Sequence, residues 1–182
     1  MKSLIIGIAV ATVTFLSCNN GTNTGTEKNK SGGDTSKSSA EANTPVAAGD
    51  ANTKSTASMK ELVGHYLELK NALANDNGEE AATHGKAIVE SIGKFDTASL
   101  TQEQKKVYND AADDAKEMAE HIGSNGNKIE HQREHFDMLS KDMFDLVKAL
   151  GTGQKLYQDY CPMYNNKKGA TWLSETKEIK NP

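Results

Sequence analysis

The sequence predicts an all-α fold: an up-down antiparallel four-helix bundle with an ordered, partly irregular C-terminal tail packed on it. Three observations predict this class. Apolar residues recur at spacings of three and four in four successive segments, turn and capping residues separate these segments, and no run of alternating polarity indicates a strand. Because the connections are short, consecutive helices are expected to be antiparallel neighbours within residues 58–150.

The first two helices are predicted at about 58–75 and 81–95. Ser58, with Glu61 three residues later, has the spacing of a capping box at the start of the first helix. The sequence Asn-Asp-Asn-Gly at 75–78 predicts the turn that separates the two helices.

The third and fourth helices are predicted at about 101–122 and 127–150. Each begins with a capping pair, Thr101 with Gln104 and Asn127 with Glu130. Gly151 is expected to end the fourth helix. This helix has the clearest apolar stripe of the chain, formed by Ile129, Gln132, Phe136, Leu139, Met143, Leu146 and Leu150.

The N-terminus has the layout of an exported lipoprotein. Residues 1–18 place one lysine before an apolar run and end in Ser17-Cys18, which resembles the site where a signal peptidase cleaves and Cys18 is lipidated. An ordinary cleaved signal with a chance cysteine is the alternative. Residues 19–57 are polar and nearly free of large apolar side chains, so a disordered polar tether is predicted there. The folded part is then one domain, 58–182.

Composition excludes several functions. A formal net charge of -4 gives no excess of cations to neutralise phosphates, so no nucleic-acid binding is expected. The chain shows no nucleophile–base pairing and no phosphate-binding glycine loop, and no histidine has the Glu-x-x-His spacing of di-iron bundles, so an enzyme is not expected. A covalent haem is excluded because Cys-x-x-Cys-His is missing.

The tail, 151–182, carries the sharpest chemical signal. Cys161-Pro162-Met163 places a thiol and a thioether one residue apart, and both are soft donors that suit Cu(I) or Ag(I). If Cys18 is lipidated, Cys161 is the remaining thiol in an oxidising compartment, which favours a use for it. The alternative is that Cys161 is a small buried hydrophobe and Met163 fills a gap in the packing.

Three histidines extend this donor set. His131 and His135 are four residues apart and share one helix face, and the predicted hairpin brings His121 close to them. The alternative is that all three are solvated on the bundle flank. His65 and His84 are interpreted as surface residues. Gln132 is expected to form a hydrogen bond with the tail or with a ligand histidine, because a buried unpaired amide is costly. Arg133 is likewise expected to contact the tail.

Four strings together resemble an uncharacterised domain of Gram-negative envelope proteins that is often fused to the C-terminus of heavy-metal efflux adaptors. These strings are YLELKNAL, HQREHF, LYQDYCPMYNNKKGATWLS and EIKNP. The resemblance spans about Lys60 to Pro182. It implies a periplasmic role in copper or silver handling, with Cys161, Met163 and His135 at positions matching the motif and His121 a further match. His131 is a candidate ligand on geometric grounds alone, because the resemblance does not assign it.

The resulting expectation is a lipid-anchored periplasmic protein that binds Cu(I) or Ag(I) for buffering or hand-over in metal resistance. Its membrane contact would be through the lipid anchor only, and its partners would be the soft metal ion and an efflux adaptor or other envelope protein. The sequence lacks the barrel and coiled-coil parts of an adaptor, so a free-standing binder fits better. The competing hypothesis is an interaction module that docks on an envelope complex and binds no metal.

Overall fold

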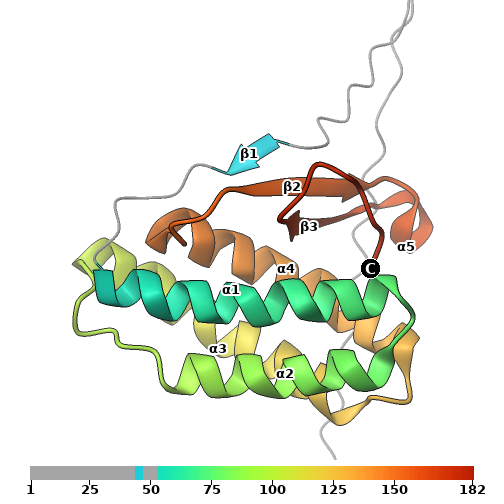
Figure 1. The fold of residues 1–182 in the computed structure, drawn as a ribbon, viewed down its shortest axis with the longest axis horizontal. Coiled ribbons are helices and arrows are strands. Elements are labelled where there is room, and N and C mark those ends of the chain that lie inside the picture. Colours follow the sequence, from blue (N-terminus) through green and yellow to red (C-terminus); the bar gives the residue numbers. More distant parts are fainter. Residues whose placement is uncertain (1–43, 47–52) are drawn as a thin grey trace, which may run out of the picture. The chain divides into compact units, whose positions relative to one another are not determined.

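A computed structural model describes residues 44–46 and 53–182 of the chain (Figure 1). Within these residues four long helices form a bundle, as the sequence predicts. Consecutive helices pack side by side, and the fourth returns to pack against the first. The long helices are α1 (Thr53–Ala74), α2 (Gly78–Gly93), α3 (Gln102–Ser124) and α4 (Ile129–Leu150).

Several predicted helix ends are confirmed. The capping box at the start of α3 is complete, because Thr101 Oγ1 accepts from the N–H of Gln104 while the Gln104 side chain accepts from the N–H of Thr101. Asn77, in the predicted turn, caps α2 by accepting from the N–H of Glu80. Gly151 follows α4 with a φ of 69°, a conformation that glycine adopts without a Cβ penalty.

Two predicted caps are wrong. Ser58 lies inside α1, which begins at Thr53. The predicted start is too late because the first turns of this helix carry small and polar residues and the apolar period starts only after them. Asn127 does not cap α4. The N-cap position belongs to Lys128 and has no side-chain cap bond.

The tail is more regular than predicted, and the expectation that no strand forms is wrong. Strand β2 (Leu156–Cys161) pairs antiparallel with β3 (Ala170–Ser174), and β1 (Thr44–Val46) pairs antiparallel with the other side of β2. A short turn, α5 (Tyr164–Lys167), connects β2 to β3. The chain reverses there through positive φ values at Asn165, Asn166, Lys167 and Gly169. Asparagine and glycine tolerate this region best.

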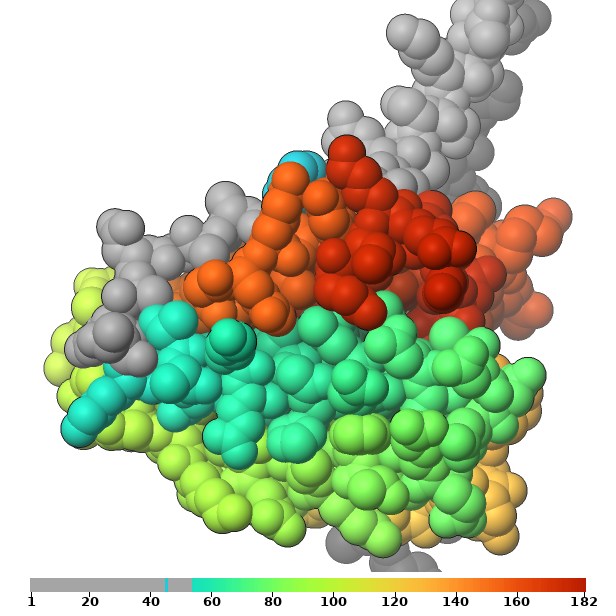
Figure 2. Space-filling model, viewed as in Figure 1, coloured from blue at the N-terminus to red at the C-terminus, as the bar shows by residue number. Residues whose placement is uncertain are grey.

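The sheet packs on the bundle, as expected for an ordered tail. Leu156, Trp172 and Leu173 are buried in the same core as the helices, and β3 packs against α4. The space-filling view shows the C-terminal segment lying directly on α1 (Figure 2). One polar bridge crosses this boundary, because buried Lys70 of α1 contacts Glu175 just after β3, with 2.8 Å between Nζ and Oε2.

The predicted signal peptide, the lipidated Cys18 and most of the predicted tether lie outside the described residues. Strand β1 and the start of α1 fall within the stretch 19–57 that the sequence assigns to the tether. No helix among residues 53–182 combines the length and the apolar character needed to cross a bilayer.

Candidate metal centre

The α3–α4 hairpin positions the three histidines. His121 lies in the last turn of α3, and His131 and His135 lie in the first two turns of α4. Gln132 fixes the junction: its side chain is fully buried, and its Nε2 donates to the carbonyls of Ile122 at 3.1 Å and Gly78 at 2.9 Å. These bonds hold the end of α3 and the start of α2 against α4.

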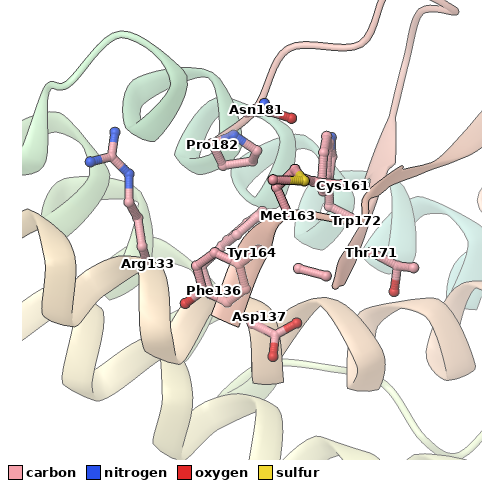
Figure 3. Close-up of a pocket in the computed structure, with 11 residues that line it drawn as sticks. Arg133, Phe136, Asp137, Cys161, Met163, Tyr164, Thr171, Trp172, Asn181 and Pro182 are labelled. Atoms are coloured by element: carbon pink, nitrogen blue, oxygen red, sulfur yellow. The ribbon is translucent and has the colours of Figure 1, made fainter. Parts of the chain in front are cut away.

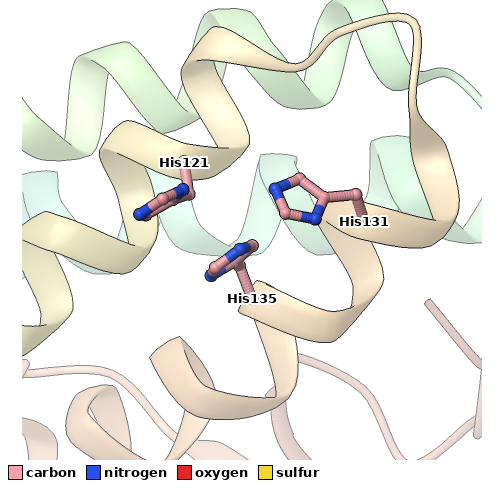
Figure 4. A group of neighbouring side chains, drawn as sticks. All are labelled: His121, His131 and His135. Carbon is pink, nitrogen blue, oxygen red and sulfur yellow. The ribbon is translucent and has the colours of Figure 1, made fainter.

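The three imidazoles converge at this end of the bundle (Figure 4). Each offers one nitrogen, and the three nitrogens lie within 4.8 Å of one another. The rings of His121 and His135 are stacked, with centroids 4.3 Å apart and an interplanar angle of 5°. The ring of His131 stands edge-on to that of His135, with centroids 4.4 Å apart. The predicted proximity of these side chains is therefore what the hairpin produces.

Electrostatics favour the neutral imidazole at His135. Partial burial, together with the neighbouring His121 and His131, lowers the pKa of His135, and this outweighs the opposing effect of Glu134 and Glu117. A metal ion needs the unprotonated ring. His135 therefore presents a free lone pair over more of the pH range than an ordinary histidine.

The cluster can hold a small transition-metal ion after one adjustment. With metal–nitrogen bonds of about 2.0–2.1 Å at tetrahedral angles, the nitrogens of three ligands lie about 3.3–3.4 Å apart. The stacked rings of His121 and His135 cannot both direct an in-plane lone pair at one ion. His121 has a side chain that is 46% exposed, so it is the ring that is free to rotate and close the site.

A sulfur atom that the sequence analysis does not include among the candidate ligands lies beside this cluster. Met118 is partly buried on α3, one turn before His121, and its Sδ is 3.3 Å from Nδ1 of His135. Apolar residues at helical spacing are typical of a core, so the sequence does not single out Met118 as a ligand. The signal that would have found it is the Met-x-x-His spacing, since residues three apart share a helix face.

The sequence-predicted set of five metal ligands divides between two places. Cys161 and Met163 line a cavity of about 290 Å³ between the tail and α4, together with Arg133, Phe136 and Asp137 (Figure 3). His135 does not line it. Each helical residue turns the side-chain direction by about 100°, so Asp137 and His135 point to opposite sides of α4.

The two sulfur-bearing residues of this cavity differ in exposure. Cys161 is half-buried and forms no disulfide within the described residues. The side chain of Met163 is 69% exposed. The remaining lining is mostly apolar and aromatic, contributed by Tyr164, Ala170, Thr171, Trp172, Asn181 and Pro182.

Two polar side chains of α4 have partners other than those predicted. Gln132 bonds backbone carbonyls of the bundle and neither the tail nor a histidine. Arg133 donates to the Leu73 carbonyl at 2.9 Å and to Asp76 Oδ1 at 2.6 Å, so it holds the end of α1 instead of the tail. The Leu73 and Ile122 carbonyls each also accept a backbone N–H, from Asp76 and Asn125 respectively, and a carbonyl oxygen has a second lone pair for the side chain.

The two other histidines are not fully on the surface. His65 and His84 are both half-buried, with ring centroids 5.9 Å apart. Nδ1 of His84 is buried and has no hydrogen-bond partner among the described residues. No third donor of the described residues joins this pair.

Searches among curated proteins and among solved structures give no match to this chain. A family does match, over residues 62–155, which contain most of the bundle and all three clustered histidines but end before Cys161. Its description is "Protein of unknown function (DUF3347)". The match covers more than half of the sequence, and the chain therefore belongs to this family.

Proposed function

We propose that the chain is an envelope lipoprotein that binds a soft metal ion, Cu(I) or Ag(I), through His121, His131 and His135. The observation that carries the proposal is the convergence of three imidazole nitrogens within 4.8 Å at the loop end of the α3–α4 hairpin. Imidazole is a ligand of copper and other late transition metals. Three such donors leave a coordination position open to a further ligand or an acceptor.

The envelope location and the role in metal resistance depend on the sequence. The leader ending at Cys18 supports lipid anchoring with the domain facing the periplasm, and the resemblance to domains fused to efflux adaptors supports buffering or hand-over of the ion. Cys161 and Met163 are proposed as a second, separate pair of soft donors. Their exposure suits brief contact with an ion or a partner, whereas the histidines offer more ligands at one point.

The test is an anaerobic Cu(I) titration of the full chain, purified in detergent, against a colorimetric chelator. Alanine at all three of His121, His131 and His135 is expected to weaken binding by at least 100-fold. Alanine at both His65 and His84 is the matched control, because this pair lacks a third donor, and it is expected to leave the affinity unchanged. The Cys161→Ser and Met163→Leu variants are titrated in parallel.

Each outcome identifies a site. Loss in the triple histidine variant alone supports the proposal. Loss in the Cys161→Ser and Met163→Leu variants with full binding in the triple variant would move the site to the tail and contradict it. Absence of binding by the folded wild-type chain would leave the second candidate function, a docking module for an envelope partner such as an efflux adaptor. The largely apolar cavity beside Cys161 favours that second candidate.

A further inference from the structure

The thioether of Met118 lies next to the histidine cluster. It comes from α3, while the nearest ring, that of His135, comes from α4, and Sδ and Nδ1 are 3.3 Å apart. The side chain packs against the hydrophobic core, so its place does not depend on a bound ion. A neutral sulfur donor is therefore already held next to the histidine cluster.

The spacing of this pair is that of two ligands on one ion. A metal–nitrogen bond of about 2.0 Å and a metal–sulfur bond of about 2.3 Å at a tetrahedral angle separate the two donor atoms by about 3.5 Å. The observed 3.3 Å is within a few tenths of an ångström of this value. The donor atoms of His135 and Met118 are thus already at the separation that one shared ion requires, and the rings of His121 and His131 complete the set.

We propose that Met118 is the fourth ligand of the metal site and that its sulfur makes the site select monovalent Cu(I) or Ag(I) over Zn(II). This inference rests on the proposed function. A thioether is a soft donor that favours Cu(I). Zn(II) is bound in proteins by thiolate, imidazole and carboxylate, and a thioether is not among these usual ligands. No carboxylate of the described residues belongs to the close group of donor atoms, so the ligand set is neutral.

The nearby acids stay outside this set. Glu117 Oε1 is 3.9 Å from His121 Nε2, and Glu134 Oε2 is 3.8 Å from His131 Nδ1. At these distances each carboxylate can orient its histidine ring without replacing it as a ligand. A neutral ligand set with carboxylates outside it suits an ion of charge +1, because the ligands themselves need to compensate little positive charge.

The first experiment places the ion by NMR. The full chain in detergent micelles, carrying ¹³C-methyl methionine, is titrated with Ag(I) as a redox-inert substitute for Cu(I). The ε-methyl signal of Met118 is expected to shift together with the ring signals of His121, His131 and His135, while that of Met59, buried on α1, stays in place. Shifted histidine signals with an unmoved Met118 signal would overturn the fourth ligand and leave the metal site standing. Unmoved histidine signals would overturn the metal site as well.

The second experiment measures selectivity. Met118→Leu, which keeps the volume of the side chain, is expected to weaken Cu(I) binding at least ten-fold and to leave Zn(II) binding within two-fold of wild type. Met59→Leu, the same substitution at a buried position of α1, is the matched control. If Met118 only orients the ring of His135, both metals will weaken alike in Met118→Leu, and that result would refute the selectivity.

Discussion

The hydroxyl of Tyr66 accepts a hydrogen bond from the backbone N–H of Leu173 at 3.1 Å, which ties helix α1 to strand β3 inside the protein. The same oxygen is 2.8 Å from Oγ of Ser140 on α4. One fully buried side chain therefore connects two helices and the sheet. The tail is held to the bundle by a polar contact as well as by its apolar residues.

Removing this hydroxyl is expected to destabilise the protein. Tyr66→Phe leaves the Leu173 N–H buried without its acceptor, which costs about 1–3 kcal/mol. Ser140→Ala is the matched comparison, because it leaves the bond to Leu173 in place and is expected to cost less. Urea unfolding of both variants measures the difference. Equal losses would show that the Leu173 bond contributes nothing.

Buried Lys70 and its neighbour Asp159 predict that a substitution of Lys70 lowers the stability in a pH-dependent way. Burial raises the pKa of Asp159, and the neighbouring Lys70 opposes this rise. Lys70→Met removes the cation, so a buried carboxylate loses its compensation and stability falls by about 3 kcal/mol at pH 7.5. A raised folded-state pKa means that the penalty applies above that pKa and disappears below the unfolded-state value. The loss is therefore expected to be smaller at pH 5, as measured by thermal unfolding at both values.

Two helical glycines are expected to respond oppositely to alanine. A Cβ at Gly85 would lie 2.9 Å from the Ala119 carbonyl oxygen and from the Gly123 nitrogen, so α2 and α3 would have to separate. Gly85→Ala should cost about 1–3 kcal/mol. A Cβ at Gly64 meets no atom within 4 Å, so Gly64→Ala should stabilise by about 0.5–1 kcal/mol. Melting temperatures that change in the same direction would contradict this reading of the close helix contact.

Replacing Asp142 with asparagine is expected to stabilise the protein. Burial first, and then Asp114 and Asp145, raise its pKa to about 6 from 3.8, against the opposing effect of Lys141. The folded protein therefore holds this proton more tightly than the unfolded chain, and stability is lost as the pH rises from about 4 to about 6. Asp142→Asn should add about 1 kcal/mol at pH 7.5, a value reduced for partial solvent screening, and clearly less at pH 4.5. An equal gain at both values in thermal unfolding would refute the assignment.

Metal binding to the folded state should raise the melting temperature. A ligand at 100 times its dissociation constant stabilises the native state by about 2.7 kcal/mol. Ag(I) is therefore expected to raise the melting temperature of wild type and not that of a variant with alanine at His131 and His135. A similar rise in both proteins, recorded by circular dichroism, would place the stabilising ion elsewhere.

The helices could be predicted because their signals are local. Apolar spacing and the Thr101–Gln104 capping box depend on residues within a few positions of one another. The sheet could not, because neighbouring residues Trp172 and Leu173 are both buried, and Asp159 is buried in the middle of β2. A strand enclosed in this way shows no alternation of polar and apolar residues. The asparagines at 165–166 were the available signal for its turn.

The candidate site could be predicted in part for a similar reason. The spacing of four between His131 and His135, with the hairpin, is sufficient to bring His121 to them. The separation of Cys161 and Met163 from this cluster depends on which side of α4 the tail covers. That side is decided by long-range packing of the tail against α1 and α4, for which no short sequence pattern exists.

All three histidines and Met118 lie in one continuous stretch of chain that folds back on itself once. Assembling the ligands therefore requires closure of one short loop, whose entropic cost is small. The tail, by contrast, is attached through contacts between residues far apart in sequence, such as Tyr66 and Leu173. Local opening that detaches the tail would separate the two walls of the cavity beside Cys161 and leave the geometry of the hairpin intact, so an ion bound at the proposed site would be retained while the Cys161 thiol became accessible to another molecule.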